Sequence, residues 1–363
     1  MTEPRVSPES LSAKSSPPWL LFGVVTALLV VALVALATDA SSLYRVANRV
    51  EARLLLFPLA STIVSYTAMA ASYQRIAATA GLNVGLWEMM KITLASTSAN
   101  YVFSTGGLSG LAVRSYLFSQ RYGLSSGNAV SISLAQTFLT NFVLLAFLFW
   151  GLLNLLLEGR LHGSSQAIVA LLFFVSVMVS TAAVAVVASR TARERVLGFL
   201  MWIPTLFSRV LRDHGDRLRG RFELFEAEIH EGVDFLIARG TQMLVPLCYI
   251  ALDWFLMLAT LYASFYCVAE PVPMHIVVIG FSTGVFLSII NLVPGGLGIM
   301  EGSMAAVFAS FGVPLESAIV ATIIFRVSYY VLPLTLTMLF FRQMVVFPRN
   351  VAGSAASSGM HSA

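Results

Sequence analysis

Long apolar runs with almost no charge constrain this 363-residue chain more than any other feature. A helix that crosses a bilayer needs about 20 apolar residues, and several runs of that length exceed what a soluble core can bury. Only 11% of the residues are charged, against about 25% in soluble domains, and the mean hydropathy is +0.83. The sequence therefore predicts an all-α polytopic membrane protein. We expect about six full transmembrane helices, at Leu20–Ala37, Leu54–Tyr73, Ala129–Leu157, Ala167–Ala188, Thr241–Val268 and Ser317–Phe341.

Two further apolar stretches, Trp87–Arg114 and His275–Phe311, are interrupted midway by glycines. Glycine and proline break helical hydrogen bonding, and lipid tolerates an open backbone only where protein encloses it or it lines a cavity. We therefore predict two broken, re-entrant segments, which brings the total to as many as eight hydrophobic spans. A kinked helix that still crosses is the alternative for each. The predicted breaks contain Gly106, Gly107 and Gly110 in the first stretch, and Pro294, Gly295, Gly296 and Gly298 in the second.

The distribution of basic residues indicates the orientation. Suppose that the N-terminus is cytoplasmic and that each broken segment returns to the side from which it starts. Most of the 22 basic residues then lie in the cytoplasm, Arg326 lies within a span, and the outer loops hold Arg45, Arg49, Arg53 and Arg160. Short cytoplasmic loops carry an excess of arginine and lysine in this way. We therefore predict that both termini are cytoplasmic.

The two glycine breaks indicate an internal repeat. A shift of 189 residues places Gly106 on Gly295 and Gly107 on Gly296. In the predicted topology the two units enter their breaks from opposite sides, which is an inverted repeat with a substrate site near the membrane midplane. The predicted organisation is a disordered N-terminus (1–18), one transmembrane domain (19–341) and a disordered tail (351–363). The domain contains two repeat units (about 54–157 and 241–341) and an amphipathic cytoplasmic linker (189–240).

Two of these segments keep a second interpretation. The run at Leu20–Ala37 could be a cleaved signal peptide, although its length and the spans that follow favour a retained helix. The linker either joins the two units as a helical hairpin or makes a regulatory contact with anionic lipid.

Ionisable residues within the spans are candidates for a substrate path, because each costs roughly 2.5–3.5 kcal/mol to insert. Glu301 follows the second break, Asp253 lies in mid-span, and Arg326 lies within the last span. Arginine suits a phosphate or carboxylate group, so these residues could line a polar path. They could instead form a buried Glu–Arg or Asp–Arg pair that only locks helices together. We expect Arg114 at the cytoplasmic rim, either contacting a lipid phosphate or following the charge bias of the loops.

The sequence gives little support for a metal site, a nucleotide-binding loop or a catalytic centre. The five histidines show no metal-ligand spacing, and the glycine pairs lack the lysine and hydroxyl residue of a phosphate-binding loop. We predict no catalytic residues, no metal, no cofactor and no nucleic-acid partner. The chain is more transporter-like than enzyme-like.

The residues around both breaks resemble the lysylphosphatidylglycerol synthase transmembrane-domain family, also called flippase-like. The second motif runs from Asn291 through Pro294, Gly295, Gly296 and Gly298 to Glu301, followed by Gly312 and Ala318. The first motif is similar, with Asn100, Gly106, Gly107, Gly110 and Arg114, but Ser104-Thr105 stands where the family more usually has a proline. Asn291 joins the predicted substrate path on this resemblance.

The resemblance implies a stand-alone member, without a soluble transferase domain, in the bacterial inner membrane. Its expected activity is to move a polar or anionic lipid head group between leaflets, through a midplane cavity between the two broken segments. The substrate would be an anionic phospholipid, a glycolipid or a polyprenyl-linked lipid, and a lipid-synthesis enzyme is a possible partner. The alternative is a membrane-embedded subunit, or a transferase, of a lipid or glycolipid biosynthesis complex.

Overall fold

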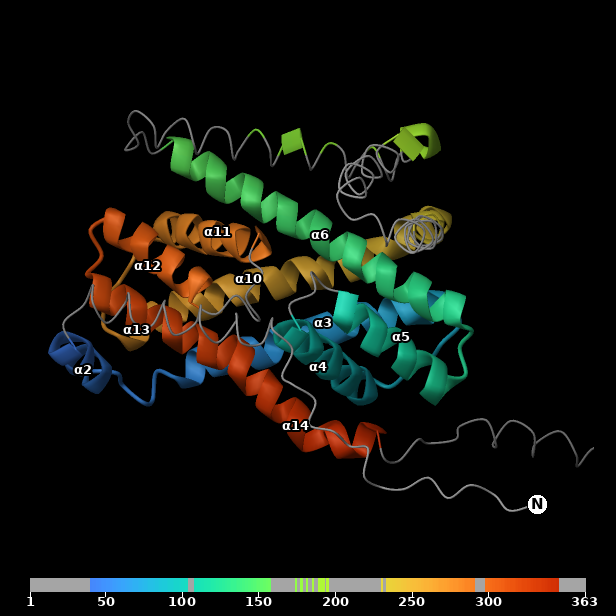
Figure 1. Ribbon diagram of the computed structural model, residues 1–363, viewed down its shortest axis with the longest axis horizontal. Helices are drawn as coiled ribbons and strands as arrows, with labels where there is room; N and C mark the ends of the chain where they lie inside the picture. Colours follow the sequence, from blue (N-terminus) through green and yellow to red (C-terminus); the bar gives the residue numbers. More distant parts are fainter. Residues whose placement is uncertain are drawn as a thin grey trace, which may run out of the picture.

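The computed structural model describes residues 40–103, 108–157, 233–290 and 298–345, together with scattered positions between 174 and 230. Within these ranges every regular element is a helix, which confirms the predicted all-α fold (Figure 1). The first group of helices is α2 (Ala40–Asn48), α3 (Leu56–Thr79), α4 (Leu86–Phe103), α5 (Leu108–Tyr122) and α6 (Ser126–Leu157). The second is η2 (Gly240–Met243), α10 (Leu244–Cys267), α11 (Met274–Ile290), α12 (Ile299–Ser310), α13 (Leu315–Arg326), η4 (Val327–Val331) and α14 (Leu332–Val345).

Three helical stretches are long and apolar enough to cross a membrane, at Gly127–Asn154, Val233–Cys267 and Leu315–Phe340. They correspond to three of the predicted crossings, so the chain is a multi-pass membrane protein. The second stretch begins inside the predicted linker, because the helix from Val233 continues through η2 into α10. The predicted run at Leu20–Ala37, most of Ala167–Ala188, most of the linker and both tails lie outside the described residues.

The predicted crossing at Leu54–Tyr73 corresponds to α3, which is more polar than the three stretches above. With 24 residues α3 is about 36 Å long, enough for the roughly 30 Å of bilayer hydrocarbon. Three of its polar side chains face protein rather than lipid: Thr62, Ser65 and Ser72 are at most 1% exposed. Small polar residues of this kind let membrane helices approach closely.

Each broken stretch folds into an antiparallel helical hairpin. In the first, α4 and α5 contact each other along the hairpin. Near the start of α5, Ser109 bonds to the carbonyl of Ala99, and at the open end of the hairpin Arg121 lies 3.5 Å from Glu88. In the second, α11 contacts α12 in the same way, with Phe308 against Gly280 and Met304 against Gly284. Both stretches therefore turn back to the end of the molecule where they begin.

The helix bounds repeat along the chain with an offset of 188 residues, one less than the offset of the glycine breaks. This shift places α3 on α10 and α4 on α11, and it carries α6 onto the continuous run from α13 to α14. α3 and α10 lie side by side and run antiparallel, because Ser61 bonds to the carbonyl of Leu256 while Ser72 bonds to that of Pro246. Equivalent helices thus point in opposite directions, as an inverted repeat requires.

The two hairpins open toward opposite ends of the molecule. At one end, Arg239 bonds to the carbonyl of Thr79 at 3.1 Å, and Trp87 contacts Phe340. At the other end, Ser317 bonds to Glu270, close to a small cavity that Arg45 also lines. In Figure 1, α11 and α12 lie toward the left and α5 toward the right, while α3 and α10 run across the middle of the bundle.

Candidate functional site

Glu301 occupies the first turn of α12, directly after the second break. One carboxylate oxygen accepts a 2.7 Å hydrogen bond from the backbone N–H of Gly298, which has φ of +84°, a left-handed conformation that favours glycine. The bond satisfies one of the free N–H groups at the start of the helix, which would otherwise be costly in lipid. The side chain therefore has a structural role at the break, and it is only 18% exposed.

The other carboxylate oxygen of Glu301 pairs with Arg326, whose side chain is 8% exposed. Arg326 ends α13, and the chain then passes through the π-helical turn η4. Such turns are rare and are frequent at functional sites. The guanidinium carbon lies 4.0 Å from the ring centroid of Tyr330, and Nη1 lies 3.4 Å from the sulfur of Met300. The Glu301–Arg326 pair, which the sequence offers as the alternative to an open polar path, therefore forms among aromatic and sulfur neighbours.

Tyrosines from three helical elements continue the polar cluster away from this pair. The rings of Tyr330 and Tyr101 are 4.5 Å apart, centre to centre. The hydroxyl of Tyr101 lies 3.1 Å from that of Tyr66, which also approaches the carbonyl of Tyr329 at 3.1 Å. Tyr66 belongs to α3, Tyr101 to α4 and the other two to η4, so the cluster joins both repeat units.

Asp253 lies at the far end of this cluster and is 5% exposed. Its Oδ1 accepts hydrogen bonds from the hydroxyl of Tyr329, at 2.9 Å, and from that of Ser65. Ser65 and Asp253 are separated by 188 residues, which is the offset of the repeat. Because they occupy equivalent positions and touch each other, the approximate twofold axis relating α3 and α10 passes between them. We define the tyrosine cluster as Tyr66, Tyr101, Tyr329 and Tyr330, with Glu301–Arg326 at one end and Asp253–Ser65 at the other.

The remaining predicted path and break residues either lie apart from the tyrosine cluster or lie outside the described residues. Arg114 is buried between α3, α4 and α5 instead of lying at a rim, and it takes no part in the tyrosine cluster. Gly110 lies in the first turn of α5, where its N–H donates to the side-chain oxygen of Asn100 at 2.6 Å. The predicted residues Asn291, Pro294, Gly295, Gly296, Gly106 and Gly107 lie outside the described residues.

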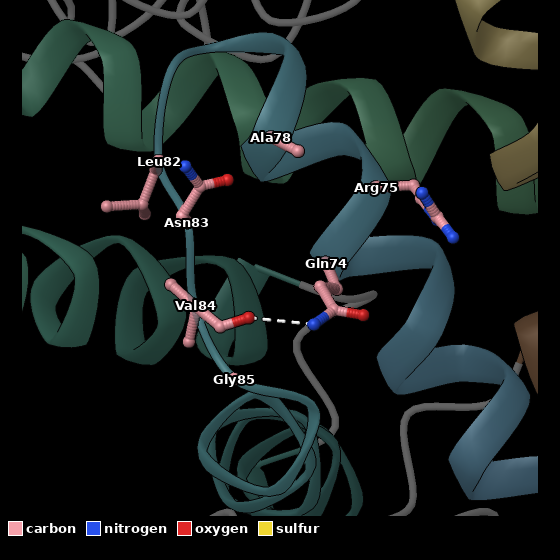
Figure 2. A pocket seen from close by; sticks show the side chains of 7 residues that line it. All are labelled: Gln74, Arg75, Ala78, Leu82, Asn83, Val84 and Gly85. Atoms are coloured by element: carbon pink, nitrogen blue, oxygen red, sulfur yellow. Dashed lines mark hydrogen bonds between the residues drawn. The ribbon is translucent and has the colours of Figure 1, made fainter.

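A separate cavity lies away from this cluster. It has a volume of about 400 Å³ and lies at the end of α3 and along the turn to α4. Figure 2 shows Gln74 donating a hydrogen bond to the carbonyl of Val84 across one wall, while the Arg75 side chain points away from it. Neither Arg75 nor Asn83 is buried, so this hollow lacks the enclosed charges that distinguish the Glu301–Arg326 region.

The sequence indicated the three charged residues of the cluster but not the tyrosines that connect them. A tyrosine in an apolar span is also typical of a lipid-facing or interfacial residue, so its type alone carries no signal. The neighbouring pair Tyr329-Tyr330, three and four residues after Arg326, is the one local hint. Within the described part of the chain, no group of three His, Cys, Asp or Glu side chains is placed to hold a metal ion.

Comparisons with known proteins agree with the membrane architecture. The chain is 23% identical over 248 residues to a UPF0104 membrane protein of Methanothermobacter thermautotrophicus, covering 68% of this chain and 72% of that protein. A second match to a UPF0104 membrane protein of the same organism has 29% identity over 118 residues, covering 30% of this chain and 34% of that protein.

The family model described as "Lysylphosphatidylglycerol synthase TM region" matches residues 20–336, a range that includes both hairpins and the whole tyrosine cluster. The match covers most of the chain and confirms the resemblance seen in the two glycine motifs. The chain therefore belongs to the lysylphosphatidylglycerol synthase transmembrane-region family.

Proposed function

We propose that this protein is a lipid translocase, which moves a polar or anionic lipid head group between leaflets while the acyl chains stay in the bilayer. The observation that carries the proposal is the buried polar cluster from Glu301–Arg326 to Asp253, enclosed by helices of both units. Ionisable groups at membrane depth are costly and mark substrate pathways by default. Inverted repeats with paired broken helices place substrate sites at the unit interface.

The cluster offers groups that suit a head group. Arg326 presents a guanidinium that can exchange the Glu301 carboxylate for a phosphate or carboxylate of the lipid. The tyrosine hydroxyls of Tyr66 and Tyr101 supply donors and acceptors for a polar or sugar head group. In this proposal, the two hairpins dip into the bilayer from opposite faces, and one unit rocks against the other to give access from each side.

We further propose that the protein resides in a bacterial cytoplasmic membrane with both termini in the cytoplasm. In that orientation the end of the molecule with Arg239, Lys91 and Arg121 faces the cytoplasm, and the end with Arg45 and Arg49 faces outward. A lipid-synthesis enzyme that supplies the substrate is the expected partner. The two-unit organisation over residues 54–157 and 241–341 is part of the same proposal.

Reconstituted liposomes test the translocase activity. Purified protein is incorporated into vesicles that contain a trace of head-group-labelled phosphatidylglycerol or glycolipid, and a membrane-impermeant reductant bleaches the label in the outer leaflet. With active protein the inner-leaflet label also becomes accessible over time. Accessibility equal to that of protein-free vesicles, for both anionic and glycosylated lipids, would refute the proposal.

Matched variants link the activity to the cluster. Glu301→Gln and Arg326→Gln each remove one charge from the buried pair, and both should abolish transport. Glu51→Gln and Arg53→Gln remove the same charges from exposed positions between α2 and α3 and should leave transport unchanged. Full activity in the Glu301→Gln protein would remove this residue from the path.

A further inference from the structure

Arg114 is a buried cation, and two of its three guanidinium nitrogens lack a hydrogen-bond partner among the described residues. Its side chain lies inside the first hairpin and is 4% exposed. The guanidinium carbon sits 3.9 Å from the ring centroid of Tyr73, and Nη2 approaches the hydroxyl of Ser96 at 3.4 Å. Its Nε and Nη1 atoms have no hydrogen-bond partner among the described residues. These two nitrogens carry three of the five N–H donors of the guanidinium.

A second buried arginine among the described residues shows what Arg114 lacks. Arg326 also stacks on a tyrosine, but it pairs with Glu301. The 188-residue offset places Arg114 on Gly302, so the two arginines are not equivalent positions of the repeat. In the described part of the chain, no carboxylate pairs with Arg114. The first unit therefore holds a buried positive charge without the counter-ion that the second unit supplies.

The position of Arg114 is deep rather than interfacial. Arg121, seven residues further along α5, pairs with Glu88 at the open end of the hairpin. Seven residues of helix rise about 10 Å, so Arg114 lies about that far inside the hairpin. The cation–π contact with Tyr73 offsets part of the charge, and Nε and Nη1 remain without a hydrogen-bond partner among the described residues. A buried guanidinium in this state favours an anion with several acceptor oxygens, and phosphate matches its geometry.

We infer that Arg114 binds the phosphate of a lipid head group inside the first hairpin, against Tyr73 and Ser96. The inference rests on the proposed translocase function for the identity of the ligand, and it narrows the substrate class to phosphate-bearing lipids. The lipid phosphate supplies the negative charge that Glu301 supplies to Arg326. Glycolipids without a phosphate lack the group that this site takes.

Binding to the purified full-length protein in neutral detergent tests this site directly. The probes are dihexanoyl-phosphatidylglycerol, uncharged dihexanoylglycerol and inorganic phosphate, and the readout is the midpoint of thermal unfolding, which rises when a ligand binds the native state. We expect the phosphatidylglycerol to raise the midpoint of the wild type, and dihexanoylglycerol to have no effect. Arg114→Met, which keeps an unbranched side chain but removes the guanidinium, should lose this response.

Two further variants keep the result interpretable. Arg114→Lys retains the charge but loses the planar donors, and it should bind the phosphatidylglycerol about ten- to a hundredfold more weakly, as expected for lost charge-assisted hydrogen bonds. Arg53→Gln removes an exposed arginine and should respond as the wild type does. An unchanged response in Arg114→Lys, or in a folded Arg114→Met protein, would overturn the assignment. Equal stabilisation by inorganic phosphate alone would make this a free-phosphate site and overturn the lipid assignment.

Comparing lipid binding with lipid transport by the wild type separates this inference from the translocase proposal. A wild type that binds phosphatidylglycerol through Arg114 but moves no lipid in vesicles would keep the binding site and refute the translocase. A wild type that moves lipids with and without phosphate equally well, and shows no phosphatidylglycerol response, would keep the translocase and refute the site.

Discussion

Removing one partner of the Glu301–Arg326 pair should cost far more stability than removing both. In Glu301→Gln the amide oxygen can still accept the hydrogen bond from Gly298, so the start of α12 is preserved. Arg326, which is 8% exposed, then keeps a full charge without its counter-ion. Breaking a buried ion pair in this way typically costs about 3–5 kcal/mol.

The opposite change should cost less. In Arg326→Gln the remaining carboxylate is 18% exposed and still lies at the N-terminus of α12, where the helix dipole favours a negative charge. We expect a loss of about 2 kcal/mol, because the dipole offsets part of the burial cost. The double variant Glu301→Gln/Arg326→Gln buries no net charge, so its stability should return to within about 1 kcal/mol of the wild type.

Thermal unfolding in detergent, followed by tryptophan fluorescence, measures the three differences. At about 2–4 °C per kcal/mol, Glu301→Gln should unfold about 6–20 °C below the wild type, and the double variant close to it. Glu51→Gln, in an exposed position, is the matched control. Losses that simply add in the double variant would show that the two side chains do not interact. In that case the pairing is not what keeps these charges in the bundle.

Three other predictions follow from single contacts. Gly110→Ala places a methyl group against the side chain of Asn100 and the carbonyl of Ser96, and should lower stability by about 1–3 kcal/mol, read as a lower unfolding midpoint than that of Ala112→Gly. Tyr101→Phe keeps the ring contact with Tyr330 but removes the hydroxyl that meets Tyr66, and should cost about 1 kcal/mol while slowing transport in vesicles; unchanged transport would exclude this hydroxyl from the path. Exchanging the axis residues in the double variant Ser65→Asp/Asp253→Ser should restore most of the stability lost in Asp253→Ser alone, because Tyr329 reaches both positions; no recovery in the unfolding midpoint would contradict the pseudo-symmetry.

The helical architecture was readable from the sequence because lipid leaves few options for the backbone. Apolar runs at Ala129–Leu157, Thr241–Val268 and Ser317–Phe341 all became membrane-length helices. The glycine breaks also marked where each hairpin turns, since α5 starts just after Gly107 and α12 just after Gly298. α3 was less apolar than a lipid-facing helix because its polar side is covered by α10, which hydropathy alone does not reveal.

The site was readable only in part, because its geometry depends on contacts between distant segments. Charge within a span is a strong signal by itself, so Glu301, Arg326 and Asp253 stood out. Tyr66 and Tyr101 became informative only when folding placed them between Arg326 and Asp253. Arg114 was misplaced at a rim for a similar reason, since its depth follows from the pairing of α4 with α5 and not from its distance to the break.

The pseudo-twofold axis distinguishes contacts near it from contacts away from it, which matters for the proposed translocase movement. Glu301 and Arg326 both belong to the second unit, so a rocking movement of one unit against the other would carry them together. Ser65 and Asp253 belong to different units but lie beside the axis, where α3 contacts α10. Tyr101 and Tyr330 join the two units away from that axis. If the protein is the translocase that we propose, we expect a path to Arg326 to open by separation of the Tyr101–Tyr330 contact, while the Asp253–Ser65 hydrogen bond holds the two units together.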